Sequence, residues 1–136
     1  MELAELYHLA ERAALSAYAP YSHFRVGAAL LGADGNIYTG CNVENRSFSL
    51  TICAERSALV AAVSQGQRSF TALAIATPDS QEPVGPCGAC RQMLSEFMGP
   101  DSAVYFSGSG GNPVTTTMGA LLPYDSLHDL KDRATT

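Results

Sequence analysis

The sequence has few basic residues and no cluster of them. It contains 8 lysines and arginines against 13 aspartates and glutamates, for a formal net charge of −5, and the bases are scattered along its 136 residues. Proteins that bind nucleic acid usually present a basic patch or stripe to the phosphates. The charge balance therefore disfavours nucleic acid as a partner or substrate.

Long apolar runs and a leader-like N-terminus are also missing. No stretch approaches the roughly 20 apolar residues that a membrane-spanning helix needs, and Glu2, Glu5 and Glu11 stand where a secretory leader would be basic. We therefore expect no membrane partner and a cytoplasmic location. In that compartment the 4 cysteines are expected to be free thiols, available to a metal, rather than disulfides.

The length and the 46% hydrophobic content suit one hydrophobic core and leave no room for two. We expect a single domain over residues 1–136. Hydrophobic periodicity predicts helices near residues 3–17, 53–63, 87–97 and 118–122, and strands near residues 24–30, 37–41, 71–77, 103–107 and 114–117. This alternation predicts an α/β fold, specifically a three-layer α/β/α domain with a mixed sheet of about five strands.

Three cysteines in two separate segments are the most informative residues. Cys53 begins an alanine-rich helical run, and Cys87 and Cys90 follow Pro86 at the start of another helix. Residues at i and i+3 share one helix face, so Cys87 and Cys90 can bind the same ion. Helix N-termini favour the thiolate form, which binds metal. Because catalytic zinc takes three protein ligands and keeps a fourth position open, the cysteines predict one catalytic zinc ion per chain.

Two charged residues after Cys53 are expected to support that site. Glu55 is two positions further on, about 200° around an ideal helix, so it is not expected to bind the same ion and suits a general base beside it. Three thiolates make the metal complex negative and weaken the ion as a Lewis acid. Arg56 is expected to donate to the sulfurs and withdraw charge, with Arg91 beside Cys90 as a weaker candidate.

These segments resemble the zinc-deaminase signature, in which a metal ligand stands two residues before a glutamate and P-C-x-x-C follows later. The matching residues are Cys53-Ala54-Glu55 and Pro86-Cys87-Gly88-Ala89-Cys90, the three-cysteine form. Residues 18–30 and 40–45 also resemble the corresponding stretches of the small homotetrameric cytidine deaminases. The four motifs follow that family's order and spacing, and the resemblance extends from about Tyr18 to Pro123.

The resemblance implies a zinc-dependent hydrolase of pyrimidine salvage. Such an enzyme converts cytidine and 2′-deoxycytidine to uridine and 2′-deoxyuridine and releases ammonia. It implies zinc (Zn2+) held by Cys53, Cys87 and Cys90, with Glu55 as the catalytic residue that moves protons. It also implies a small-molecule nucleoside as substrate and a homotetramer as the assembled form.

Four further positions are implied to bind the substrate: Phe24, Asn42, Glu44 and the backbone of Ala54. On composition alone, Phe24 is more typical of ordinary core, and residues 42–45 are more typical of a solvated turn. In the resembled family the phenylalanine packs on the pyrimidine ring, the asparagine and glutamate bind mainly the ribose 3′-hydroxyl, and the alanine backbone binds the base. A sugar-binding pair favours a nucleoside over a free base.

Several alternatives remain at this point. In one alternative, Cys41 is a fourth zinc ligand and the site is purely structural. Such a zinc module would not need Glu55. However, the spacing of 12 residues between Cys41 and Cys53 lacks the paired knuckle of such sites, and a small buried side chain is the expected role. Other deaminases would keep the zinc set and act on a free base, an aminopyrimidine nucleoside antibiotic or nucleic acid. The sugar-binding pair argues against a free base as substrate, and the net negative charge of the chain argues against nucleic acid.

The chain departs from the resembled family after Leu121-Leu122-Pro123. A phenylalanine usually follows there and reaches into the neighbouring subunit's site, whereas this chain has Tyr124. Tyr124 either replaces that contact or marks its loss. His8 and His128 are both expected at the surface.

Overall fold

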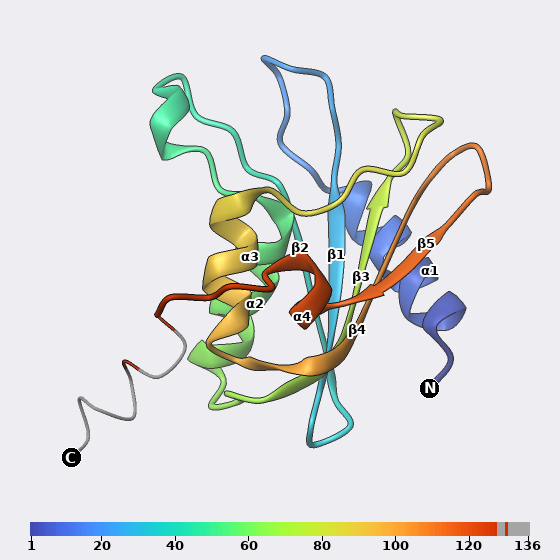
Figure 1. Ribbon diagram of the computed structural model, residues 1–136. Helices are drawn as coiled ribbons and strands as arrows, with labels where there is room; N and C mark the ends of the chain where they lie inside the picture. The colour runs from blue at the N-terminus through green and yellow to red at the C-terminus, as the bar shows by residue number, and fades with distance from the viewer. Residues whose placement is uncertain (128–129, 131–136) are drawn as a thin grey trace.

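A computed structural model describes residues 1–127 and 130 of the chain, with residues 128–129 and 131–136 outside the description (Figure 1). The five strands are β1 (Gly27–Gly32), β2 (Ile37–Cys41), β3 (Phe70–Thr77), β4 (Met98–Gly108) and β5 (Val114–Thr117). They form one sheet in the order β2-β1-β3-β4-β5. Only β3 and β4 pair in parallel among these neighbours, so the sheet is mixed, as the sequence predicts.

Helices cover both faces of this sheet. Helix α1 (Leu3–Ala14) packs on one face, and α2 (Ala54–Ser64), α3 (Gly88–Ser95) and the short α4 (Met118–Leu121) lie on the other (Figure 1). A 3-10 turn, η1 (Phe48–Leu50), lies in the loop before α2. The predicted three-layer α/β/α fold is confirmed.

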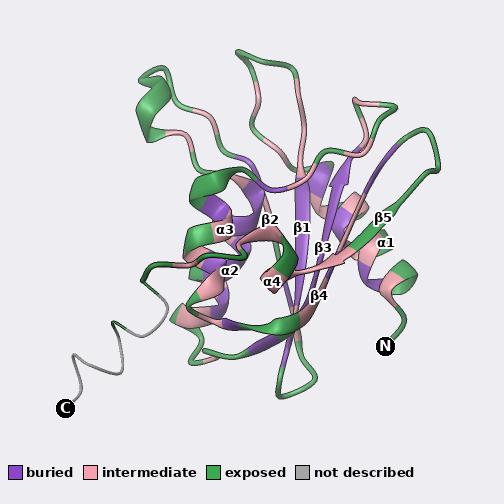
Figure 2. Cartoon of the chain, in the orientation of Figure 1, coloured by how far each residue is buried: buried purple, intermediate pink, exposed green. Residues whose placement is uncertain are grey.

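The core consists of two layers separated by the sheet, and β3 contributes to both. Ala72, Ala74 and Ala76 pack towards α1, whereas Leu73 and Ile75 pack towards α2 and α3. This accounts for the unalternating apolar run in β3, because a strand covered on both faces needs apolar residues at every position. Figure 2 shows buried residues concentrated in the central strands and on the inner faces of the helices.

Two predicted strands begin several residues away from their predicted starts. The strand predicted to start at Phe24 starts at Gly27. The preceding segment is held by a side chain, since Asn42 Nδ2 donates to the Phe24 carbonyl at 2.8 Å and Asn42 Oδ1 accepts from the Val26 amide at 2.9 Å. Strand β4 starts at Met98, earlier than predicted, because Met98 pairs with Phe70 on β3 ahead of the glycine and proline that follow it.

Other expectations concern the surface and the chain as a whole. In the part of the chain that is described, no helix is long and apolar enough to cross a membrane. His8 is exposed and lies 2.8 Å from the Glu11 carboxylate, whereas His128 falls outside the described residues. That residues 1–136 form a single domain stays a prediction.

Helix α2 lies unusually close to strand β2 at Gly40. A Cβ atom added to Gly40 would lie 2.4 Å from the Ala58 amide nitrogen and 2.9 Å from the Ala54 carbonyl oxygen. Those atoms belong to the helix backbone and cannot rotate away. The missing side chain at Gly40 therefore determines how close α2 can approach the sheet.

Replacing this glycine tests that close approach. We expect Gly40→Ala to lower the free energy of unfolding by about 1–3 kcal/mol, because α2 must shift to admit the methyl group. Chemical denaturation measures this value. Gly99→Ala is the control, since a Cβ at Gly99 has its nearest contact 4.0 Å away, at Ser102 Oγ. Equal stability of the two variants would contradict the packing described here.

Candidate active site

Three thiols meet where two helices begin. Cys53 is the residue before α2, Cys87 is the residue before α3, and Cys90 lies in the first turn of α3. Their Sγ atoms all lie within 4.8 Å of one another, and those of Cys87 and Cys90 are 3.4 Å apart. In the described part of the chain, no other group of three or more His, Cys, Asp or Glu residues comes close enough to share an ion.

This donor set fits zinc. Tetrahedral zinc with Zn–S bonds of about 2.3 Å places its sulfur ligands about 3.8 Å apart, which is close to the spacing of these thiols. Sulfur ligands are soft donors and select zinc over magnesium or calcium. Cys41 is half-buried and is not part of the three-thiol group. Cys41 therefore does not act as the fourth ligand that a closed structural zinc site would need.

Arginine side chains support both segments that carry the thiols, in different ways. Arg56 Nη2 donates to Cys53 Sγ at 3.7 Å and to the Thr51 carbonyl at 3.1 Å, which confirms the predicted contact with a sulfur. Arg91 instead binds backbone: its Nε donates to the Pro86 carbonyl at 2.8 Å, and its Nη1 donates to the Leu121 carbonyl at 3.2 Å. Arg91 thus stabilises the loop that leads to Cys87 by binding it to the end of α4.

The thiols differ in how readily they ionise. A hydrogen bond from the Cys90 thiol, supported by Arg56, lowers the pKa of Cys53 to about 5. That same hydrogen bond, together with burial, raises the pKa of Cys90. Cys53 therefore becomes a thiolate at a lower pH than Cys90 does. Metal binding requires thiolates, so the arrangement prepares one sulfur in advance.

Glu55 is a buried carboxyl group beside the thiols. It is the second residue of α2, and its exposed fraction is 5%. Burial raises the pKa of Glu55 because the charged form loses its hydration. A carboxyl group with a raised pKa holds a proton more readily than an ordinary glutamate does, which suits a residue that must take up and release protons.

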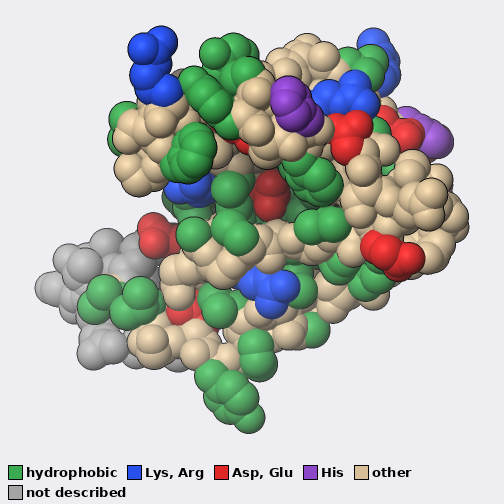
Figure 3. All heavy atoms as spheres, turned by 90° about the horizontal axis from the view of Figure 1, so that it is seen from above, with side chains coloured by type: hydrophobic (Ala, Val, Ile, Leu, Met, Phe, Trp, Pro, Cys, Tyr) green, Lys and Arg blue, Asp and Glu red, His purple; other side chains and the backbone are tan. Residues whose placement is uncertain are grey.

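A cavity of about 190 Å³ adjoins the thiols and Glu55. Its lining residues come from the segment before β1, from the residue after β2, from β3, from the segment before α2 and its first turn, and from the loop before α3: Val26, Asn42, Thr51, Cys53, Ala54, Glu55, Ile75, Thr77, Val84, Gly85 and Cys87. Figure 3 views the molecule from above, with a hollow in the centre rimmed by hydrophobic side chains and with acidic atoms inside it. The wall is mainly apolar and has few polar groups, as small-molecule sites commonly have.

The residues expected to bind substrate lie at or next to this cavity. Asn42 and Ala54 line it, whereas Phe24 and Glu44 are not among its lining residues. The Glu44 carboxylate accepts hydrogen bonds from the Tyr21 amide at 3.0 Å, from the Ser22 amide at 3.2 Å and from the Ser22 hydroxyl. The Ser22 hydroxyl lowers the pKa of Glu44 and keeps it ionised. Asn42 and Glu44 therefore both hold the segment that contains Phe24.

Comparison with known proteins agrees with this geometry. Residues 1–107 match the sequence model of the cytidine and deoxycytidylate deaminase zinc-binding region. The chain is 50% identical over 123 residues to a cytidine deaminase of Sporosarcina psychrophila, covering 90% of each protein. It is 49% identical over 107 residues to one of Halalkalibacterium halodurans, covering 79% of this chain and 80% of the relative. The chain belongs to the cytidine and deoxycytidylate deaminase family.

A solved structure of this family has the same fold. The crystal structure of cytidine deaminase from Burkholderia pseudomallei superimposes with a TM-score of 0.86 at 44% identity, covering 90% of this chain and 98% of that one. The resemblance stated from the motifs is confirmed, and so is zinc as the cofactor of the family's binding region. The roles of individual residues stay predictions.

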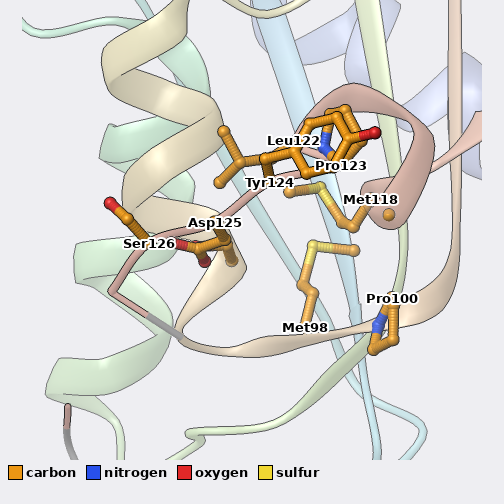
Figure 4. A pocket seen from close by; sticks show the side chains of 10 residues that line it. Met98, Pro100, Met118, Leu122, Pro123, Tyr124, Asp125 and Ser126 are labelled. Carbon is orange, nitrogen blue, oxygen red and sulfur yellow. The ribbon is translucent and has the colours of Figure 1, made fainter. Parts of the chain in front are cut away.

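Another cavity, larger than the one beside the thiols, is lined by a different set of residues. It has a volume of about 640 Å³ and is lined by Ser95, Met98, Pro100, Met118, Gly119, Leu122, Pro123, Tyr124, Asp125 and Ser126 (Figure 4). The side chains of Met98 and Met118 face one another within it. Tyr124 lines this cavity with an exposed fraction of 94% and does not line the cavity at the thiols. Among the described residues, those that line the larger cavity include no cysteine and no histidine.

Sequence reasoning missed an ion pair next to the candidate active site. The Arg25 amide donates to Asp79 Oδ2 at 2.8 Å, and the Arg25 guanidinium donates to both carboxylate oxygens, at 3.0 and 2.8 Å. This pair joins the segment before β1 to the loop that follows β3. The two residues are 54 positions apart, so no local pattern in the sequence indicates their contact.

This ion pair makes stability depend on pH in a defined range. Arg25 lowers the pKa of Asp79 to about 2. The stabilisation is therefore present above about pH 4, the ordinary value for aspartate, and is lost as the pH falls from 4 to 2. We expect Asp79→Asn to lower the melting temperature slightly at pH 7, with the difference from wild type disappearing near pH 2.

Thermal unfolding of both proteins at several pH values measures that difference. The effect is expected to be small because the pair is partly exposed to solvent. Asp101→Asn is the control: Asp101 is exposed in β4 and has no ion pair among the described residues. A difference that stays constant from pH 7 to pH 2 would contradict this account.

Proposed function

We propose that this protein catalyses the hydrolytic deamination of cytidine and 2′-deoxycytidine. The products are uridine or 2′-deoxyuridine and ammonia, and the reaction serves pyrimidine salvage in the cytoplasm. The observation that carries this proposal is that Glu55, Cys53 and Cys87 line a single cavity, with Cys90 completing the group of thiols, in a chain of the cytidine and deoxycytidylate deaminase family.

In this proposal Cys53, Cys87 and Cys90 hold the zinc ion. When bound, zinc supplies a Lewis acid that lowers the pKa of water to near 7. Three thiolates reduce that Lewis acidity through their negative charge. Arg56, which donates to Cys53 Sγ at 3.7 Å, offsets part of this charge from next to the site.

Glu55 moves the protons of the reaction. Its carboxylate accepts a proton from the attacking water and delivers it to N3 of the pyrimidine, which makes C4 more electrophilic while the water oxygen bonds to C4. Glu55 then transfers a second proton from that oxygen to the departing amino group, and ammonia leaves as the C4 carbonyl forms. The burial that raises the pKa of Glu55 makes both directions of transfer accessible.

Substrate recognition divides between base and sugar. Phe24 packs on the pyrimidine ring, where a flat apolar base gains from contact with an aromatic ring, and the backbone of Ala54 binds the base. Asn42 and Glu44 bind the ribose 3′-hydroxyl, a contact that ribose and deoxyribose share. Asn42 lines the cavity and has one Nδ2 hydrogen beyond the one given to Phe24. The ionised Glu44 provides acceptor oxygens.

One assay tests the activity against its alternatives. Ammonia release is measured with cytidine, 2′-deoxycytidine, cytosine and adenosine, before and after removal of zinc by a chelator and again after zinc is restored. We expect turnover of the two cytosine nucleosides only, abolished without zinc and recovered with it. Turnover of cytosine would indicate a free-base deaminase. Absence of turnover in a protein that contains zinc would overturn the proposal in favour of a structural zinc module.

The assignment of Glu55 is tested by its removal. General acid–base catalysis alone contributes about 10² to 10⁴ in rate, and Glu55 also activates the ring. We therefore expect Glu55→Ala to lower kcat by more than about 10⁴-fold while zinc content stays equal to that of wild type. Glu96→Ala is the control, an exposed glutamate that follows α3. Substantial turnover in Glu55→Ala with zinc bound would rule out this role.

We also propose that the protein assembles as a homotetramer, as the resembled family does. Several large apolar side chains are exposed in the chain described here: Phe48 is 73% exposed and Leu50 is 63% exposed in η1, and Val60 on α2 is 48% exposed. Surfaces of this kind are typical of protein contacts. We expect sedimentation equilibrium to give four times the chain mass of 14.3 kDa. A monomer at micromolar concentration would contradict this proposal.

A further inference from the structure

Thr77 has a hydroxyl group that the fold does not use. It is the last residue of β3, its exposed fraction is 1%, and its Oγ1 has no hydrogen-bond partner among the described residues. Its backbone, in contrast, is engaged: the Thr77 carbonyl accepts from the Ser80 amide at 3.1 Å. A buried hydroxyl without a partner destabilises the folded protein, because it has lost its hydrogen bonds to water.

Packing does not explain why this position is a threonine. On the same face of β3, the preceding residues Leu73 and Ile75 are buried and apolar. Valine has the same shape as threonine and would fill the space without burying an unpaired oxygen. The hydroxyl therefore reduces stability at this position without improving the packing.

The position of Thr77 indicates a role in the active site. Thr77 lines the cavity of about 190 Å³ together with Glu55, Cys53 and Cys87. Thr77 lies where β3 ends and the loop leading to Cys87 begins. The sheet therefore forms part of the cavity wall, and the start of α2 forms another part. Polar groups that are left unpaired in the free protein at a binding cavity are typical of residues whose partner is the ligand.

We propose that the Thr77 hydroxyl hydrogen-bonds the polar edge of the pyrimidine ring in the bound nucleoside. This rests on the proposed function. A hydroxyl group can both accept and donate by rotating its hydrogen. It can accept from the amino group at C4 of cytidine and donate to the carbonyl that replaces it in uridine. Thr77 thereby contacts both substrate and product through the same oxygen.

Two variants separate the hydroxyl from the shape of the side chain. Thr77→Val keeps the shape and removes the hydroxyl, and Thr77→Ser keeps the hydroxyl. We expect Thr77→Val to retain wild-type zinc content, to melt at the wild-type temperature or above it, and to lose about tenfold in kcat/KM for cytidine. Thr77→Ser should stay within about threefold of wild type. Uridine should raise the melting temperature of Thr77→Val less than that of the other two proteins.

Each other outcome decides against the inference. If Thr77→Val deaminates cytidine with the wild-type kcat/KM, the hydroxyl does not contact the substrate. If the variant melts at a lower temperature and loses zinc, the hydroxyl supports the fold, and the inference is equally wrong. Failure of the proposed function is distinguishable, since the wild-type protein itself would then release no ammonia from cytidine.

Discussion

The convergence of three sulfur atoms at the starts of two helices is the constraint on which the rest of the structure depends. Cys53 comes from the start of α2, whereas Cys87 and Cys90 come from the start of α3. Bringing these helix ends together requires both helices to lie on the same face of the sheet. The parallel pairing of β3 and β4 meets this requirement, because the chain must cross over that face between them and α3 is part of the crossover.

Close packing keeps this arrangement rigid. Gly40 lets the backbone of α2 approach strand β2 at a distance that any side chain would prevent. Arg91 joins the loop before Cys87 to the end of α4, and Arg56 joins Cys53 to the preceding loop. Catalytic groups must be held within a fraction of an ångström of their working positions. Backbone contacts and arginine bridges provide this precision without bulky side chains inside the cavity.

Short-range sequence patterns were sufficient to predict the three-layer fold, the grouping of the three thiols and the contact of Arg56 with a sulfur, whereas the roles of these residues and of Glu55 stay predictions. These predictions rest on residues that are neighbours on one helix or belong to a periodic segment, because their spacing in the sequence indicates which side chains share a face. The start of β1 was predicted wrongly because the side chain of Asn42, not a neighbouring strand, binds the Phe24 carbonyl and the Val26 amide. The Arg25–Asp79 pair and the unpaired hydroxyl of Thr77 depend on tertiary contacts, which no local pattern encodes.

The position of the Asn42 amide has a consequence for engineering selectivity. One amide group holds the backbone on both sides of Arg25 and also lines the cavity. A substitution at Asn42 intended to discriminate between sugars would therefore release the peptide chain next to Phe24 as well. Val84 lines the same cavity from a different loop, so a substitution there changes the cavity wall without releasing that segment.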